Sequence, residues 1–481
     1  MTTVTLSLIS HTNAGKTTLA RTLLRREIGE VRDQPHVTTI SEAHPLLEIE
    51  DARLLLWDTP GFGDTVRLLK RLHRETDPIG WFLHQVWDRV LNRALWCSQE
   101  AVRNVRGEAD VVLYLVNAAE EPESAGYVQH ELELLSWMNR PVLVLLNQVG
   151  TDGAGTTLEH WRRYLAPFEI VRGVLSLDAF SRAWVEESLV LERVVDLLDG
   201  ERRTAMVRLV RAWNERNLGV FEQASRVMAE YLAEVATDRE PIGSRSGPAG
   251  SWILGALRDL RKVSRIDRNR AMRALFDRLQ AATRRLMDRL IELHELSGSS
   301  KAQIERRLDD VALSGDEAMN PTTGAIAGGL LSGALTGIVA DIVHGGLTFG
   351  GGSVLGAILG AVGGYALGGA YRLATGPEPS VQWQLAALDR LAGEALLRYL
   401  VVAHFGRGRG AYSDLEYPAQ WAEGVEAQLK PRLGALHGAW RHAAREGRAS
   451  TAEVAERLRP VLHDTLRDLL RQRFPDAAVL S

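Results

Sequence analysis

Residues 6–19 read LSLISHTNAGKTTL, which passes from an apolar stretch through a short polar loop into an expected helix. The loop matches the phosphate-binding pattern G-x-x-x-x-G-K-[ST] except at its first position, where Ser10 stands. In such a loop, successive backbone N–H groups and the N-terminus of the helix surround the phosphates. Lys16 is expected to reach the β- and γ-phosphates, and Thr17 to give its hydroxyl to Mg²⁺. The stretch therefore predicts a phosphate site, with an ordinary helix N-terminus and an exposed lysine as the alternative.

The sequence around this stretch alternates between expected strands and expected helices. Apolar runs that end in Gly, Asn, Asp or Pro predict buried parallel strands at Val4–Ile9, Leu54–Trp57, Val111–Val116 and Val142–Leu146, and Ile170–Leu175 is a further candidate. Helical stretches fall between them at Lys16–Arg26, Glu121–Asn139 and Leu158–Leu165. Leu46–Glu50 predicts a hairpin with the second strand. This order predicts an α/β domain over residues 1–200, with a mostly parallel sheet and helices on both faces.

A second motif, Trp57-Asp-Thr-Pro-Gly61, stands at the end of an expected strand. Asp58 is expected to hold Mg²⁺ through water, and the Gly61 amide to sense the γ-phosphate. Between the two motifs lies the polar loop Asp33-Gln-Pro-His-Val-Thr-Thr39. Thr38 in this loop is the candidate for a second hydroxyl on Mg²⁺, released when the γ-phosphate leaves. The alternative is a solvated loop whose threonines bind nothing.

The loop expected to read the base departs from the pattern Asn-Lys-x-Asp. After the strand at Val142–Leu146 stands Asn147-Gln-Val-Gly150, in which the asparagine fits and the lysine and aspartate are absent. An aspartate would accept hydrogen bonds from the guanine N1 and N2 groups. Asp152 follows shortly after, and Ser176 stands where a second base-contacting loop is expected. Guanine preference is therefore left open by these residues.

Taken in this order, the motifs make residues 1 to about 200 resemble the Era/TrmE-type GTPases. The resemblance implies GTP and GDP as ligands, Mg²⁺ held by Thr17, Thr38 and Asp58, and hydrolysis at a site that contains Lys16, Thr38 and Gly61. It also implies a K⁺ ion beside the phosphates. The residues implied to contact the nucleotide or its ions are Asn13, Ala14, Gly15, Lys16, Thr17, Thr18, Asp58, Asn147 and Ser176, with Asn13 at the K⁺ position.

Phe62 stands where a Ras-like enzyme would carry its water-positioning glutamine. No side chain beside the Asp-Thr-Pro-Gly motif is an obvious general base. Catalysis would then rest on charge stabilisation by Mg²⁺, Lys16 and the loop N–H groups. We expect slow intrinsic turnover unless K⁺, a dimer or a partner completes the site.

Beyond these motifs the chain is expected to be mainly helical. Apolar residues at helical spacing predict a helical insertion at about 64–107, a helical region at 201–320 and a C-terminal helical region at 376–481. The many charges on these helices are interpreted as solvated faces. The whole chain is similar to bacterial GTPases that carry a glycine-rich C-terminal domain of unknown function.

Residues 321–375 form a glycine-rich apolar segment that predicts a helical hairpin. Glycines recur at every fourth position, which places them on one helix face where two backbones can approach closely: Gly329, Gly333 and Gly337, then Gly352, Gly356, Gly360, Gly364 and Gly368. Gly324–Val343 and Gly351–Ala370 would each span about 30 Å as a helix. We expect membrane contact through residues 324–371, with a hairpin buried in a soluble core as the alternative.

Composition bounds the remaining functions. The net charge of −4 comes from 57 basic and 61 acidic residues, so a large basic surface for nucleic acid is not expected. The single cysteine, Cys97, cannot form an internal disulfide, which favours a cytoplasmic protein, at the inner face of the membrane if the hairpin inserts.

The favoured function is a GTP-hydrolysing, Mg²⁺-dependent switch coupled to a membrane-associated or partner-binding helical region, which could include a homo-oligomer. The alternatives are a nucleotide-regulated membrane anchor or pore-like assembly protein, and a scaffold with negligible hydrolysis.

Overall fold

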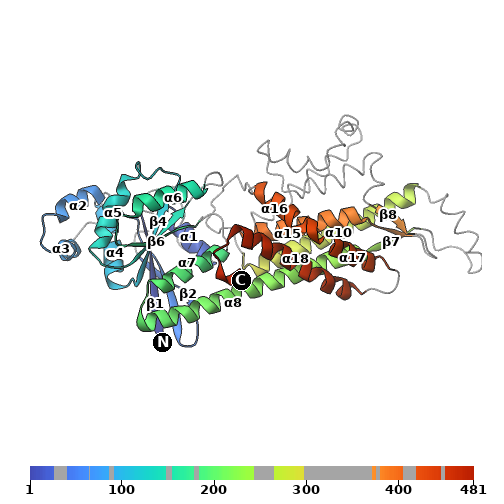
Figure 1. Ribbon diagram of the computed structural model, residues 1–481, viewed down its shortest axis with the longest axis horizontal. Coiled ribbons are helices and arrows are strands. Elements are labelled where there is room, and N and C mark those ends of the chain that lie inside the picture. Colours follow the sequence, from blue (N-terminus) through green and yellow to red (C-terminus); the bar gives the residue numbers. More distant parts are fainter. Residues whose placement is uncertain are drawn as a thin grey trace, which may run out of the picture. The chain divides into compact units, whose positions relative to one another are not determined.

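The computed structural model describes residues 1–12, 14–25, 41–63, 65–85, 92–147, 154–177, 184–242, 265–296, 371–374, 380–404, 419–445 and 450–480. Its chain forms two compact units, which we describe separately (Figure 1). The first unit contains Met1–Gly219, Ala403–Tyr412 and Phe474–Ser481, and the second contains Val220–Val402 and Ser413–Arg473. The predicted Thr38, Asn13 and glycine hairpin lie outside the described residues.

A six-stranded sheet with the order β2-β3-β1-β4-β5-β6 forms the centre of the first unit. Its strands are β1 (Thr2–Ser10), β2 (Glu42–Glu48), β3 (Ala52–Asp58), β4 (Val111–Asn117), β5 (Val142–Asn147) and β6 (Val171–Ser176). All neighbours pair in parallel except β2, which pairs antiparallel with β3. The predicted α/β class, with one antiparallel edge, is confirmed. Because the parallel strands end at one edge, Ser10, Asp58, Asn147 and Ser176 meet there.

Helices cover both faces of this sheet (Figure 1). They are α1 (Lys16–Leu24), α2 (Thr65–Leu72), α3 (Pro78–His84), α4 (Arg93–Gly107), α5 (Gly126–Ser136), α6 (Ala154–Leu165), α7 (Trp184–Asp196) and the start of α8 (Gly200–Thr237). Helices α1, α7 and α8 pack on one face, and α2 to α6 on the other. Alternate residues of β4 therefore enter different cores, Leu113 and Leu115 on one side and Val112, Tyr114 and Val116 on the other.

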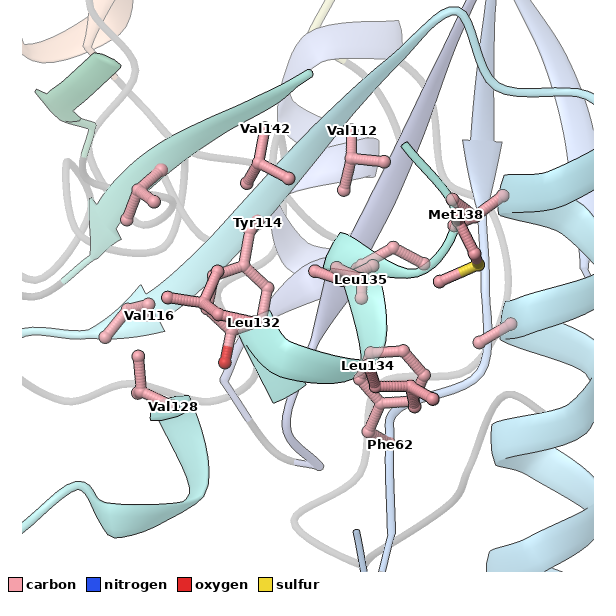
Figure 2. Packing of buried hydrophobic residues seen from close by; sticks show 14 of the residues in the cluster. Phe62, Val112, Tyr114, Val116, Val128, Leu132, Leu134, Leu135, Met138 and Val142 are labelled. Atoms are coloured by element: carbon pink, nitrogen blue, oxygen red, sulfur yellow. The ribbon is translucent and has the colours of Figure 1, made fainter. Parts of the chain in front are cut away.

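The core beneath α5 is closely packed, as Figure 2 shows. Tyr114 and Val116 of β4 lie against Leu132 and Val128 of α5, and Phe62 contributes its ring to the same cluster. A strand buried on both faces carries apolar residues at every position, which explains why the run Val111–Val116 shows no polar alternation. This core supports the sheet edge at which the predicted site residues lie.

Several elements begin at different residues from those expected. Helix α5 starts at Gly126 rather than Glu121, because the chain from Glu121 to Ala125 makes turns, with Ser124 N donating to Glu121 O at 2.9 Å. Strand β2 starts at Glu42, four residues before the expected Leu46, and a bulge between Pro45 and Leu47 allows the proline in an edge strand. Helix α7 was not expected from the periodicity.

The second unit is mainly helical, as predicted. It contains the rest of α8 with α10 (Arg265–Leu293), α15 (Leu385–Ala403), α16 (Ala419–Leu429), the short η2 (Lys430–Arg432), α17 (Leu433–Ala443) and α18 (Thr451–Arg473). A small antiparallel sheet in the order β7-β9-β8 was not expected: β7 (Arg239–Pro241), β8 (Tyr371–Ala374) and β9 (Ser380–Trp383). Strands of three or four residues are too short to show a periodicity in sequence. Among the described helices, none has the length and apolarity that crossing a membrane requires.

Candidate nucleotide site

The loop between β1 and α1 has the geometry that phosphate binding needs. Gly15 stands immediately before α1 with φ 94°, a left-handed conformation that favours glycine. A Cβ at this position would also lie 2.9 Å from the Asn147 side-chain nitrogen. The left-handed backbone conformation and the close approach of the Asn147 side chain both favour glycine at this position. The N-terminus of α1 is thereby aimed at the strand edge, an arrangement that suits an anion.

Lys16 is 7% exposed and donates from Nζ to Ser10 Oγ at 2.8 Å. Burial lowers the pKa of this lysine, while the nearby carboxylates of Asp58 and Glu131 act in the opposite direction. Ser10 is the residue that departs from the glycine of the motif, and its hydroxyl accepts the lysine's hydrogen bond. The serine is therefore compatible with the loop and contributes a polar contact within it.

Asp58 and Thr17 come from different elements and meet beside Lys16. Thr17 Oγ1 donates to Asp58 Oδ2 at 2.9 Å, and Asp58 Oδ1 is buried with no hydrogen-bond partner among the described residues. Burial raises the pKa of Asp58 to about 6, against the lowering effect of Lys16. An unsatisfied buried carboxylate oxygen beside a hydroxyl is a donor set that suits Mg²⁺. These residues fit the ion.

The segment after Asp58 lies directly against the phosphate loop. Phe62 N donates to Ser10 O at 2.9 Å, and Phe62 pairs with His11 as an isolated parallel bridge. A Cβ on Gly61 would lie 3.0 Å from Lys16 Nζ and 3.0 Å from Thr12 Cα. The Phe62 side chain is fully buried in the core beneath α5 (Figure 2). Its ring therefore lies in this core rather than at the loop, and slow turnover stays a prediction.

Asn147, at the end of β5, is tied to the phosphate loop. Its Nδ2 donates to Ala14 O at 3.1 Å, and the whole side chain is buried. Ser176 ends β6 and pairs in register with Leu146. Residues 148–153, which include Gln148 and Asp152, lie outside the described residues. Asn147 thus links the loop expected to read the base to the loop expected to hold the phosphates.

The structure brings together most residues expected at the site. Ala14, Gly15, Lys16, Thr17, Asp58, Gly61 and Asn147 lie at one sheet edge, whereas Thr18 is buried within α1. The binding and catalytic roles of all these residues stay predictions. Sequence reasoning missed Glu131, which lies on α5 and contacts His11 of the loop. Its only sequence signal is a charge at an apolar position of the α5 pattern.

Comparisons with known proteins match two separate parts of the chain. Residues 5–148 match the family described as "50S ribosome-binding GTPase", and residues 165–468 match "Domain of unknown function (DUF3482)". GTPase Era of Geobacter metallireducens is 26% identical over 158 residues, 33% of this chain and 44% of Era. GTPase Era of Heliobacterium modesticaldum is 26% identical over 146 residues, 30% of this chain and 40% of Era. The chain thus spans less than half the length of these relatives.

Solved structures similar to this chain are also GTP-binding proteins. An Aquifex aeolicus Era variant bound to GDP·AlF4− is 20% identical, with a TM-score of 0.31 over 42% of this chain and 59% of that one. A probable GTP-binding protein engB is 16% identical, with a TM-score of 0.26 over 40% of this chain and 98% of that one. The family matches and the strand order lead to one assignment. The chain belongs to the family described as a domain of unknown function (DUF3482), and its N-terminal domain is a P-loop GTPase domain.

Proposed function

We propose that this protein binds GTP with Mg²⁺ and hydrolyses it to GDP and phosphate as a molecular switch. The observation that carries the proposal is the convergence of Lys16, Thr17 and Asp58 at one sheet edge, with an unsatisfied Asp58 oxygen beside the threonine hydroxyl. Thr17 and Asp58 would hold Mg²⁺, which when bound supplies positive charge to the phosphate oxygens. Lys16 would leave Ser10 Oγ to donate to the β- and γ-phosphates.

Hydrolysis would depend on charge stabilisation more than on proton transfer by a side chain. Gly61 is close enough to Lys16 and Thr12 for its backbone N–H to meet a γ-phosphate beside the lysine. The buried Phe62 cannot orient a water molecule, so basal turnover should be slow. We propose that K⁺ at the Asn13 position supplies additional charge, as the resemblance to Era/TrmE-type GTPases implies.

We propose that the helical insertion responds to the nucleotide, because it contacts Gly63, two residues after the Asp-Thr-Pro-Gly motif. Ser98 of α4 accepts a hydrogen bond from Gly63 N at 3.1 Å and lies 3.1 Å from Gly63 O. Gln99, the next residue, donates to Phe82 O of α3 at 2.6 Å. A movement of Gly61–Gly63 with the γ-phosphate would therefore act on α4 and, through it, on α3.

We further propose that the signal reaches a membrane or a protein partner, which could be a second copy of the chain. The fourfold glycine spacing in residues 324–371 supports helix packing in a bilayer, and the protein would then be cytoplasmic at the inner face of the membrane. Flotation with liposomes tests this part. Replacing Gly356, Gly360 and Gly364 with leucine should preserve flotation but abolish helix pairing; a protein that never floats and is merely destabilised by the change would contradict membrane contact.

The central experiment is a binding and turnover panel on the full chain with GTP, GDP, ATP and ADP in Mg²⁺. We expect GTP and GDP to bind more tightly than the adenine nucleotides, and phosphate to be released from GTP. Guanine preference needs this test because Asn147-Gln-Val-Gly150 lacks the aspartate that would bind guanine. Equal affinity for GTP and ATP would contradict the preference. Tight GTP binding without phosphate release would favour the scaffold with negligible hydrolysis.

A further inference from the structure

A carboxylate is buried beneath the phosphate loop, on the apolar side of α5. Glu131 is 0% exposed, and both of its oxygens have partners. Tyr114 OH donates to Oε2 at 2.7 Å, and His11 Nδ1 lies 2.7 Å from Oε1. Burial raises the pKa of Glu131, while the contacts with His11 and Tyr114 and the charge of Lys16 oppose this effect. A buried carboxyl is costly to keep in a core, so its contacts merit a functional explanation.

The two partners of Glu131 lie in different parts of the domain, Tyr114 in the core and His11 in the phosphate loop. Tyr114 belongs to β4 and is surrounded by core residues (Figure 2). His11 is the second residue of the phosphate loop, and its side chain is 33% exposed. The imidazole stacks on Tyr127 of α5 with ring centroids 4.4 Å apart and planes inclined by 25°. The His11 side chain is thus fixed on α5 by a ring on one side and a carboxylate on the other.

The backbone of Ser10 and His11 contacts Phe62, the residue that follows the Asp-Thr-Pro-Gly motif. Ser10 O accepts the hydrogen bond from Phe62 N at 2.9 Å, and His11 itself forms the bridge with Phe62. Gly61, which precedes Phe62, stands against Lys16 and Thr12. A shift of His11 would therefore move Gly61 relative to Lys16. The helical end of the loop, from Gly15 onward, would keep its place because α1 and Asn147 hold it.

We propose that Glu131 is a positioning residue that acts through His11 to keep Gly61 and Lys16 in register for hydrolysis, an inference that rests on the proposed function. Nucleotide affinity comes mainly from the helical end of the loop, whereas the Gly61 amide acts on the γ-phosphate. Loss of the His11 contact should therefore lower kcat and leave KM and GDP affinity nearly unchanged. If Glu131 had a purely structural role, its replacement would instead lower the stability of the fold without lowering kcat selectively relative to KM and GDP affinity.

The variants are chosen so that no buried donor is left without an acceptor. In Tyr114→Phe, Glu131 keeps the His11 contact, and kcat should stay within about twofold of the wild type. Adding Glu131→Met replaces the carboxyl with an apolar chain of similar size and removes the His11 contact together with the carboxylate charge near Lys16, two effects that the mutant cycle separates. We expect kcat to fall about tenfold from Tyr114→Phe to the double variant, which corresponds to one lost interaction with a charged group. KM, GDP affinity and the melting temperature complete the comparison.

A mutant cycle tests whether Glu131 acts through His11. In the Tyr114→Phe background, His11→Ala alone should lower kcat by a similar factor, and adding Glu131→Met to it should lower kcat no further. Equal kcat in Tyr114→Phe and its Glu131→Met derivative, or additive losses in the cycle, would overturn the inference. Because His11 is partly exposed, His11→Ala reports on the contact even where the Glu131 variant does not fold. A wild-type chain that hydrolyses no GTP would contradict the proposed function instead.

Discussion

The proposed phosphate side of the nucleotide site comes mainly from one short loop, whereas the proposed base side comes from residues far apart along the chain. At the phosphate side, one short loop supplies Gly15, Lys16 and Thr17, and Asp58 is added from the neighbouring strand β3. At the base side, Asn147 and Ser176 end two strands, and Asn147 reaches the phosphate loop through Ala14 O. The phosphate side therefore depends mainly on a contiguous motif, and the base side on the sheet.

This difference predicts which substitutions should affect GTP and its hydrolysis selectively and which should affect GTP and GDP alike. A change at the phosphate side should affect the triphosphate and its hydrolysis, because Gly61 lies against Lys16 and we propose that both contact the terminal phosphate. A change at Asn147 should weaken all guanine nucleotides alike, because this residue supports the shape of the loop. The predictions below test that distinction, from the largest expected effect to the smallest.

Lys16→Ala should lower GTP hydrolysis by about a hundredfold or more, since it removes the buried lysine that we propose contacts the β- and γ-phosphates. GTP affinity should fall more than GDP affinity. Phosphate release and nucleotide titration measure the two effects. Lys70→Ala, at an exposed lysine of α2, is the matched control and should behave as the wild type. A folded Lys16→Ala protein with normal turnover would show that the phosphates bind elsewhere.

Asn147→Ala should weaken GTP and GDP equally, by about tenfold, because it removes a buried hydrogen bond to the phosphate loop. Asn117→Ala is the control: Asn117 pairs with Asn147 in register, but its Oδ1 accepts from Ala119 N at 3.1 Å outside the loop. Titration with both nucleotides checks the ratio. A loss confined to GTP would break the proposed division between the two sides of the site.

Asp58 should make the effect of Mg²⁺ depend on pH. Its folded-state pKa of about 6 exceeds the ordinary value of 3.8, so between these values the folded protein keeps a proton that the unfolded chain has lost. This contribution to stability is present at low pH and is lost as pH rises through about 6, where the ionised carboxylate becomes free to bind Mg²⁺.

With GDP bound, Mg²⁺ should therefore raise the melting temperature more above pH 6 than below it. Asp58→Asn, which removes the titrating group, should show a small Mg²⁺ effect at either pH. Thermal unfolding with and without Mg²⁺ on both sides of pH 6 measures this. An equal Mg²⁺ effect at both pH values in the wild type would remove Asp58 from the ion site.

The smallest expected effect is that of the monovalent cation. GTP hydrolysis should be faster in K⁺ than in Na⁺, because Asn13 occupies the position that the resemblance assigns to K⁺ binding and an added cation would stabilise the developing charge. Asn13→Ala should make the two rates equal. Identical wild-type rates in the two salts would contradict a K⁺ ion at Asn13 that takes part in hydrolysis.

The sequence by itself was enough to predict the phosphate loop, the Asp58 motif, the α/β class and the helical character of the second unit. Local rules decide these features: backbone N–H groups of successive residues form the loop, and strands buried on both faces are continuously apolar. The same rules placed the start of α5 and of β2 several residues away from their observed positions, because turns and a bulge interrupt the periodicity.

Only the tertiary structure decided the contacts between residues far apart in sequence. His11 meets Glu131 across 120 positions, Asn147 meets Ala14 across 133, and Ser98 meets Gly63 across 35. The sequence pattern of α5 does not show which residues Glu131 contacts. The position of Phe62 after Asp-Thr-Pro-Gly does not show that its ring is buried. These outcomes depend on which elements the sheet brings together, because side-chain contacts form only once strand order and helix packing place the residues side by side.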